Sequence, residues 1–277
     1  MKLAYSTIAC PSWSWQHAID QAGALGYDGV EWRLIDGAMV DAGFSPETAK
    51  TIAKATAAAG LGVPALDSSI QLTAEPGEAR DKVLAETRGM LRLAAAFGAE
   101  HLRVFGGTYP ESVADADALR WTQEALVALQ PEARATGVRL ALELHDCGWD
   151  RAGTRGITSS RFLADVLAGV DVPEAALQWD LGNPFLEGEP AAKTWENVRS
   201  RLAYLQVKDM VRRDGKWTYV PLGEGELPIG DIVRWVTDAG FDGWFSFEWE
   251  KWWHPEIAEA ETVLPGFPAQ LKSHRRG

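Results

Sequence analysis

The sequence is poor in the residues that build disulfide frameworks and membrane spans. Its 277 residues include only two cysteines, Cys10 and Cys147, which is too few for a disulfide scaffold and favours a cytoplasmic protein. The N-terminal segment lacks the long apolar run of a signal peptide. No stretch reaches the roughly 20 apolar residues that cross a bilayer, so we expect no membrane association.

Positive charge is scarce as well. Lysine and arginine number 27 against 39 aspartates and glutamates, which gives a net charge of −12. Basic residues cluster only briefly, at Arg212–Arg213 and in the tail His274–Arg276. An acidic chain without a broad basic patch is a poor partner for nucleic acid or an anionic membrane. We therefore expect neither as a partner.

Hydrophobic residues make up 46% of the chain, enough for a large core, and they recur in eight strand-like runs. Alanine-rich segments of helical periodicity separate these runs, and several of those segments end in glycine just before the next run. This repeated pattern, without a linker, predicts one α/β domain over residues 1–277, a (β/α)8 TIM barrel. No Gly-x-Gly-x-x-Gly follows the first run, which argues against a dinucleotide-binding sheet. The runs are Leu3–Ser6, Gly29–Arg33, Gly62–Leu66, His101–Phe105, Val138–Leu144, Ala176–Leu181, Ala203–Val207 and Trp244–Trp249.

Four consecutive runs end in an oxygen donor, namely Glu143, Asp180, Gln206 and Glu248. In a barrel the carboxyl ends of the strands meet at one mouth, and charges buried there are costly unless something compensates them. Three carboxylates and one amide suit Mg²⁺ or Mn²⁺ better than Zn²⁺. The sequence therefore predicts one divalent cation at the mouth. Ordinary salt bridges along the rim are the alternative.

The segments around these donors resemble the sugar isomerase/epimerase family with the xylose isomerase-like TIM barrel. The matching motifs are Leu142-Glu-Leu-His145, Trp179-Asp-Leu-Gly-Asn183, Gln206-Val-Lys-Asp209, Leu222-Gly-Glu-Gly225 and Gly243-Trp-Phe-Ser-Phe-Glu248. The resemblance implies that Glu143, Asp180, Gln206 and Glu248 bind the metal. It also implies that Glu143 and Glu248 exchange protons with the substrate, as in the ketose epimerases. Many members carry histidine at the third ligand position, and some carry glutamine.

Two further positions follow from the resemblance. Asn183 stands where the epimerases usually have a substrate-binding histidine, and Arg212 stands at the offset of a substrate-binding arginine. The loss of that histidine weakens the case for plain ketose 3-epimerisation. It keeps open a lyase on the same scaffold, one that dehydrates an inosose or dehydroshikimate or cleaves a 3-keto-glycoside. Family members are often dimers or tetramers, which leaves a homo-oligomer open.

Strand alternation adds candidates at the mouth. His145 and Lys208 each lie two residues after a predicted ligand and should point the same way as that ligand, as should Glu250. An imidazole is suited to act as a proton shuttle, which is one role open to His145. The alternative is that His145 only supports the neighbouring residues of the site. Lys208 either stabilises a developing oxyanion or pairs with Glu143 or Glu248 as a structural ion pair. His254 either contacts the substrate or packs against the tryptophans beside it.

Tryptophan is abundant, with 13 residues. Indole rings suit the C–H faces of sugars, and their N–H groups bind hydroxyls. We assign substrate contacts to Trp15, Trp179 and Trp249, with the core as the alternative location of each. Trp149 belongs to the same group of loop-face tryptophans, in a predicted loop over residues 146–157. The chain offers only weak candidates for a phosphate site, so we expect a non-phosphorylated sugar or keto-sugar.

These inferences favour a divalent-metal-dependent sugar isomerase or epimerase that removes a proton next to a carbonyl through an enediolate. A lyase is the alternative function. A nuclease of the same barrel type would require clustered histidines and a basic face, whereas the five histidines of this acidic chain are scattered. A sugar-binding protein without activity is a further alternative.

Overall fold

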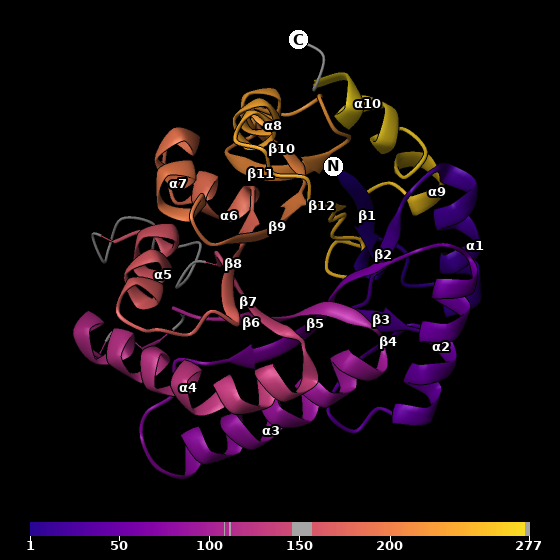
Figure 1. The fold of residues 1–277 in the computed structure, drawn as a ribbon. Helices are drawn as coiled ribbons and strands as arrows, with labels where there is room; N and C mark the ends of the chain where they lie inside the picture. The colour runs from indigo at the N-terminus through magenta and orange to yellow at the C-terminus, as the bar shows by residue number, and fades with distance from the viewer. Residues whose placement is uncertain (108, 111, 146–156, 275–277) are drawn as a thin grey trace.

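The computed structural model describes residues 1–107, 109–110, 112–145 and 157–274. Eight parallel strands form one sheet in the order β2-β1-β12-β9-β8-β7-β6-β5. Parallel bridges from Gly29 to Gly62 and from Trp32 to Leu66 join β2 to β5 and close the ring (Figure 1). The strands are β1 (Lys2–Ser6), β2 (Gly29–Glu31), β5 (Val63–Gln71), β6 (Ala99–Phe105), β7 (Arg139–Glu143), β8 (Ala175–Asp180), β9 (Leu202–Val207) and β12 (Trp244–Phe247).

The eight strands confirm the predicted barrel, and β5 runs further than expected, to Gln71. The predicted loop over 146–157, with Cys147 and Trp149, falls outside the described residues except for Ile157, and so do the tail residues Arg275 and Arg276. None of the described helices is long and apolar enough to cross a bilayer.

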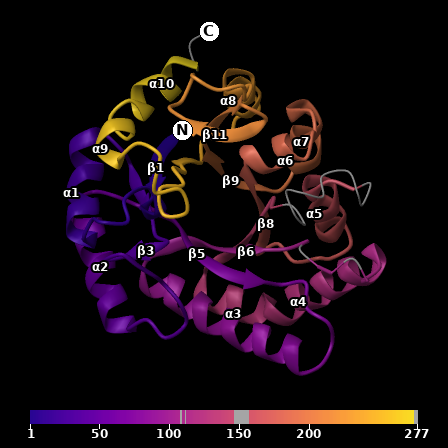
Figure 2. The same cartoon turned by 180° about the vertical axis from the view of Figure 1, so that it is seen from behind.

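Helices surround the strands in both views (Figures 1 and 2). They are η1 (Thr7–Ala9), α1 (Trp15–Leu25), α2 (Pro46–Ala58), α3 (Glu78–Ala96), α4 (Asp115–Thr136), α5 (Ser159–Ala168), α6 (Gly182–Leu186), α7 (Ala191–Val198), α8 (Ile229–Asp238), α9 (Ala260–Val263) and α10 (Phe267–Ser273). The side chains of Ser45 and Thr158 cap α2 and α5, because each hydroxyl accepts a backbone N–H of the first turn. Gly26, after α1, has φ 78°, a left-handed conformation that suits glycine.

Two short hairpins lie outside the barrel sheet. They are β3 (Leu34–Ile35) with β4 (Ala38–Met39), and β10 (Asp209–Arg213) with β11 (Lys216–Val220). The second hairpin lies in a segment that the sequence analysis left without regular structure. Its turn is Asp214-Gly215, both with positive φ, and Asp-Gly is a strong hairpin signal.

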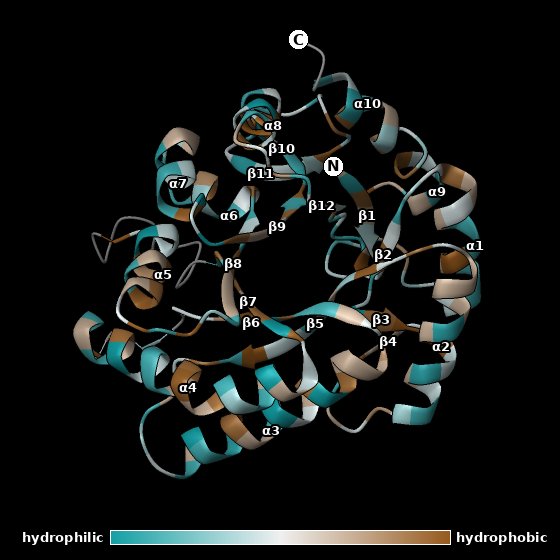
Figure 3. Cartoon of the chain, in the orientation of Figure 1, coloured by the Kyte–Doolittle hydropathy of each residue, from teal (hydrophilic) through white to brown (hydrophobic). Residues whose placement is uncertain are grey.

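The barrel interior is layered from bottom to mouth. A small apolar cluster at the bottom contains Ala4, Ala65, Tyr204 and Trp244, and the Trp244 ring lies where any Cβ on Gly29 would collide with it. Between barrel and helices lies the main core, into which the amphipathic helices turn their apolar residues (Figure 3). Polar side chains gather above the apolar bottom, and the layering therefore places the chemistry at the carboxyl ends of the strands.

Candidate active site

A polar layer supports the barrel mouth from below. Glu31 is fully buried, and its carboxylate accepts hydrogen bonds from Tyr204 Oη at 2.8 Å, from Gln206 Nε2 at 3.0 Å and from Ser246. Gln206 Oε1 in turn accepts from Gln178 Nε2 at 2.9 Å. Both ends of the Gln206 amide are thus engaged in this lower network, and its role as a metal ligand stays a prediction.

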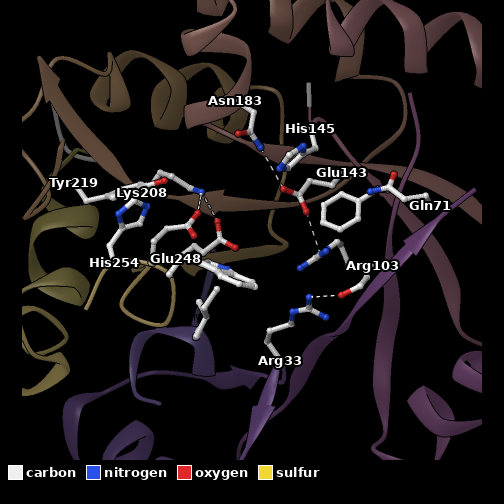
Figure 4. Close-up of a pocket in the computed structure, with 15 residues that line it drawn as sticks. Arg33, Gln71, Arg103, Glu143, His145, Asn183, Lys208, Tyr219, Glu248 and His254 are labelled. Carbon is white, nitrogen blue, oxygen red and sulfur yellow. Dashed lines mark hydrogen bonds and ion pairs between the residues drawn. The ribbon is translucent and has the colours of Figure 1, made fainter. Parts of the chain in front are cut away.

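A cavity of about 420 Å³ opens above that layer (Figure 4). It receives side chains from β5, β6 and β7, from the loops that follow β2, β7, β9 and β12, and from η1, α6 and β11. Glu250, the further mouth candidate, lines it too. Six of the predicted catalytic and substrate residues line this cavity, namely Glu143, His145, Asn183, Lys208, Glu248 and His254.

Lys208 forms the centre of an acidic cluster on one side of the cavity. Its ammonium lies 2.7 Å from Asp180 Oδ2, 2.5 Å from Glu248 Oε2 and 2.7 Å from Glu250 Oε1. The residue is 2% exposed, so these contacts compensate a buried charge. The predicted pairing of Lys208 with Glu248 is confirmed, whereas Glu143 pairs with a different cation.

That other cation is Arg103 of β6, which the sequence analysis did not select. Its Nε lies 3.1 Å from Glu143 Oε2 and 3.6 Å from Asp67 Oδ1, and its Nη1 donates to the Ser68 carbonyl. Arg33, after β2, lines the same side of the cavity and is 5% exposed. A charged residue inside a run that reads as a buried strand was the signal that could have identified both arginines.

Asn183 is held beside Glu143 by the first turn of α6. Asp180 Oδ1 accepts the backbone N–H groups of Gly182 and Asn183 at 2.7 and 2.8 Å. Asn183 Nδ2 then donates to Glu143 Oε1 at 3.3 Å. His145 follows Glu143 and meets the Phe105 ring edge-on at a centroid distance of 4.9 Å. His254 lies 5.0 Å from the Tyr219 ring at the opposite side.

The buried carboxyl groups differ in pKa. Burial raises the pKa of Glu143 above its ordinary value, although Arg103 opposes the shift. Burial likewise raises the pKa of Asp180 in spite of Lys208. For Glu248, burial is outweighed by the attraction of Lys208 and by hydrogen bonding, and the pKa is lowered. The cavity therefore pairs one carboxyl that holds its proton more strongly with one that releases it readily.

Two of the predicted substrate tryptophans face away from the cavity. Trp179 and Trp249 adjoin Asp180 and Glu248 in sequence, so strand alternation turns them towards the helices. Trp179 stacks on Trp195, and Trp249 stacks on Phe247 and donates to the Ala258 carbonyl at 2.8 Å. Both predictions were wrong because the alternation that places the acids inward places their neighbours outward.

Trp15 and Arg212 also lie elsewhere. Trp15 begins α1, packs against the main core and donates its backbone N–H to Asp36. Arg212 is exposed on β10, where its backbone N–H donates to Glu226. Neither residue lines the cavity, whereas Trp253, which is 54% exposed, does. The hairpin explains Arg212, because it carries that residue away from the mouth.

The binding of a divalent cation by Glu143, Asp180, Gln206 and Glu248 stays a prediction. Among the residues that the structure describes, no group of three or more acidic, histidine or cysteine side chains has the spacing of a metal site. The Lys208 ammonium stands between Asp180 and Glu248. The donor chemistry nevertheless fits a hard cation, since Glu143 Oε2, Asp180 Oδ2 and Glu248 Oε2 are buried carboxylate oxygens that already face positive charge, from Arg103 or Lys208. A divalent ion bound there requires the Lys208 side chain to withdraw.

Comparison with known proteins agrees with this architecture. The profile of the xylose isomerase-like TIM barrel family matches residues 19–264. The chain belongs to this family. Fructoselysine 3-epimerase of Escherichia coli O157:H7 is 29% identical over 84 residues, which span 30% of this chain and 29% of that protein.

Solved structures align over almost the whole chain. The probable 3-DHS dehydratase AsbF of Bacillus anthracis has a TM-score of 0.74 at 17% identity and covers 98% of both chains. D-psicose 3-epimerase of Clostridium cellulolyticum, solved with D-tagatose, has a TM-score of 0.73 at 14% identity and covers 99% of this chain and 96% of its own. At such identities the likeness shows the fold alone.

Proposed function

We propose that this protein is a sugar isomerase or epimerase that moves a proton next to the carbonyl of a non-phosphorylated sugar or keto-sugar. The observation that carries the proposal is the convergence of Glu143 and Glu248, from two strands of the barrel, on one cavity where each adjoins a buried cation. The names of the related epimerases agree with this choice.

The two glutamates divide the proton transfer between them. Glu248, with its lowered pKa, is ionised and suited to remove the proton. Glu143, whose pKa is raised by burial, is suited to hold a proton and return it to the substrate. Asn183 fixes the orientation of the Glu143 carboxyl through its hydrogen bond to Oε1.

Negative charge that develops on the carbonyl oxygen requires a cationic partner. Lys208 and Arg103 provide fixed positive charge on two sides of the cavity. We propose that Glu143, Asp180 and Glu248 would also hold a Mn²⁺ or Mg²⁺ ion once Lys208 withdraws. Such an ion, when bound, polarises a carbonyl as a Lewis acid.

A lyase remains the second candidate, and the position of His145 favours it. His145 lines the cavity next to Glu143, which gives that side a second group able to transfer a proton. Such a group could protonate a leaving hydroxyl after the first proton has been removed. The AsbF structure, titled a probable dehydratase, has the same fold. Isomerisation conserves mass, whereas elimination releases water or an aglycone and creates an enone that absorbs ultraviolet light.

The test is solvent exchange. The chain is incubated with Mn²⁺ in D₂O and a panel of free ketoses, inososes and 3-keto-glucosides, and NMR follows the products. We expect deuterium at one carbon with the wild type and none with Glu143→Gln or Glu248→Gln. The control Glu224→Gln changes an exposed acid away from the cavity and should exchange normally. Exchange that persists in both cavity variants would refute the assigned roles.

A further inference from the structure

Arg33 is a buried cation whose partners in the fold are neutral. Its Nη1 donates to the Asp67 carbonyl at 3.2 Å, and its Nη2 donates to Ser69 Oγ at 2.6 Å. Within the described ranges of the chain it forms no ion pair. The carboxylates of Asp67, Glu143 and Glu248 attract it only from beyond ion-pair distance, so a bound anion would stabilise this buried charge further.

Arg103, the other buried arginine of the cavity, has carboxylate partners in the fold. It is equally buried, and its guanidinium faces the carboxylates of Glu143 and Asp67. Burial, followed by repulsion from Arg103, lowers the pKa of Arg33 to about 10, although the carboxylates of the cavity oppose the shift. Both arginines line the cavity, but among the described residues only Arg103 has carboxylates at ion-pair distance.

The geometry leaves Arg33 able to bind a ligand. A guanidinium has five N–H donors in one plane, and the hydrogen bonds to Asp67 and Ser69 use two of them. The side chain lines the cavity, opposite Lys208 and His254 (Figure 4). Two parallel N–H groups match the two oxygens of a carboxylate.

We infer that Arg33 binds a carboxylate of the substrate, so that the sugar on which the proposed function acts is a sugar acid. A carboxylate suits the site better than a phosphate, because one negative charge balances one guanidinium. A dianion would face stronger repulsion from the acids already present, and among the described residues that line the cavity the fixed cations are Arg33, Arg103 and Lys208. Those acids are Glu31, Asp67, Glu143, Asp180, Glu248 and Glu250.

The experiment compares ligands that differ only at the terminal carbon. D-fructose is paired with D-fructuronate and D-tagatose with D-tagaturonate, and dissociation constants are measured by calorimetry on the full chain with Mn²⁺. We expect the acid of at least one pair to bind at least tenfold more tightly than its neutral partner. In Arg33→Met that ratio should fall to about one, and Arg33→Lys should keep part of it. Arg213→Met, at an exposed arginine of the hairpin, should keep the full ratio.

Other outcomes overturn the inference. A ratio near one in the wild type, a ratio that survives in Arg33→Met, or no binding by either acid contradicts it. A larger gain with fructose 6-phosphate that also depends on Arg33 identifies the anion as phosphate and refutes the carboxylate. Deuterium exchange on the neutral ketoses is scored separately, so the proposed function can stand when the carboxylate site fails. A melting curve for each variant, with Arg33→Gln as a second substitution, confirms that the fold is intact.

Discussion

The two sides of the cavity differ in how their buried charges are paired. On the Lys208 side, one ammonium faces the carboxylates of Asp180, Glu248 and Glu250. On the arginine side, Arg33 and Arg103 lie together and only Arg103 has ion-pair partners among the described residues. The difference suggests that one side attracts positive charge and the other attracts negative charge. A substrate with a carbonyl at one end and an anion at the other would be oriented by this asymmetry.

The largest expected effect separates two acids that touch the same lysine. Glu248→Gln should slow proton exchange by about 10³-fold, because it removes the proposed base. Glu250→Gln should slow it by less than about tenfold, because that residue only neighbours Lys208 and proton transfer keeps its base. NMR in D₂O under saturating substrate measures both rates. Equal losses would show that the cluster acts through its total charge and not through Glu248.

The next effect concerns stability on the arginine side. Arg103→Met should lower the free energy of unfolding by about 3–5 kcal/mol, because it leaves Glu143 and Asp67 buried without their cation. Urea denaturation followed by circular dichroism measures the change. A loss below about 1 kcal/mol would indicate that these carboxyls are neutral in the folded chain.

Arg33→Met should stabilise the fold, in contrast to Arg103→Met. Removal of an unpaired buried charge should raise the free energy of unfolding by about 2 kcal/mol. The folded state lowers the pKa of Arg33 to about 10. The buried charge therefore destabilises the fold fully below pH 10, where the guanidinium is protonated in both the folded and the unfolded chain. The advantage of the variant should shrink only above pH 10. A destabilised Arg33→Met would show that its neutral contacts outweigh its charge.

The smallest effect concerns Lys208 and metal. Lys208→Met should tighten Mn²⁺ binding by about tenfold, because the ion no longer displaces an ammonium from Asp180 and Glu248. Electron paramagnetic resonance of free Mn²⁺ gives the affinity without an activity assay. Lys251→Met, at a lysine bound to Glu259 and two carbonyls outside the cavity, is the matched control. Weaker binding in Lys208→Met would mean that the lysine supports the ion.

The sequence predicted the barrel well, because parallel strands buried on both faces and glycine-ended helices repeat so regularly. It also predicted which acids meet at the mouth, since strand ends converge. The pairing of Lys208 with Asp180 could not be read from it, because that contact depends on the register between β8 and β9. Trp179 could have been excluded by alternation alone, and Asp214-Gly215 could have identified the hairpin.

The direct test of the account is deuterium incorporation during incubation with Mn²⁺ and the sugar panel, read carbon by carbon by NMR. The account predicts label at a single carbon next to the carbonyl, and loss of that label in both Glu143→Gln and Glu248→Gln. Label that enters at an unchanged rate in both variants would contradict it.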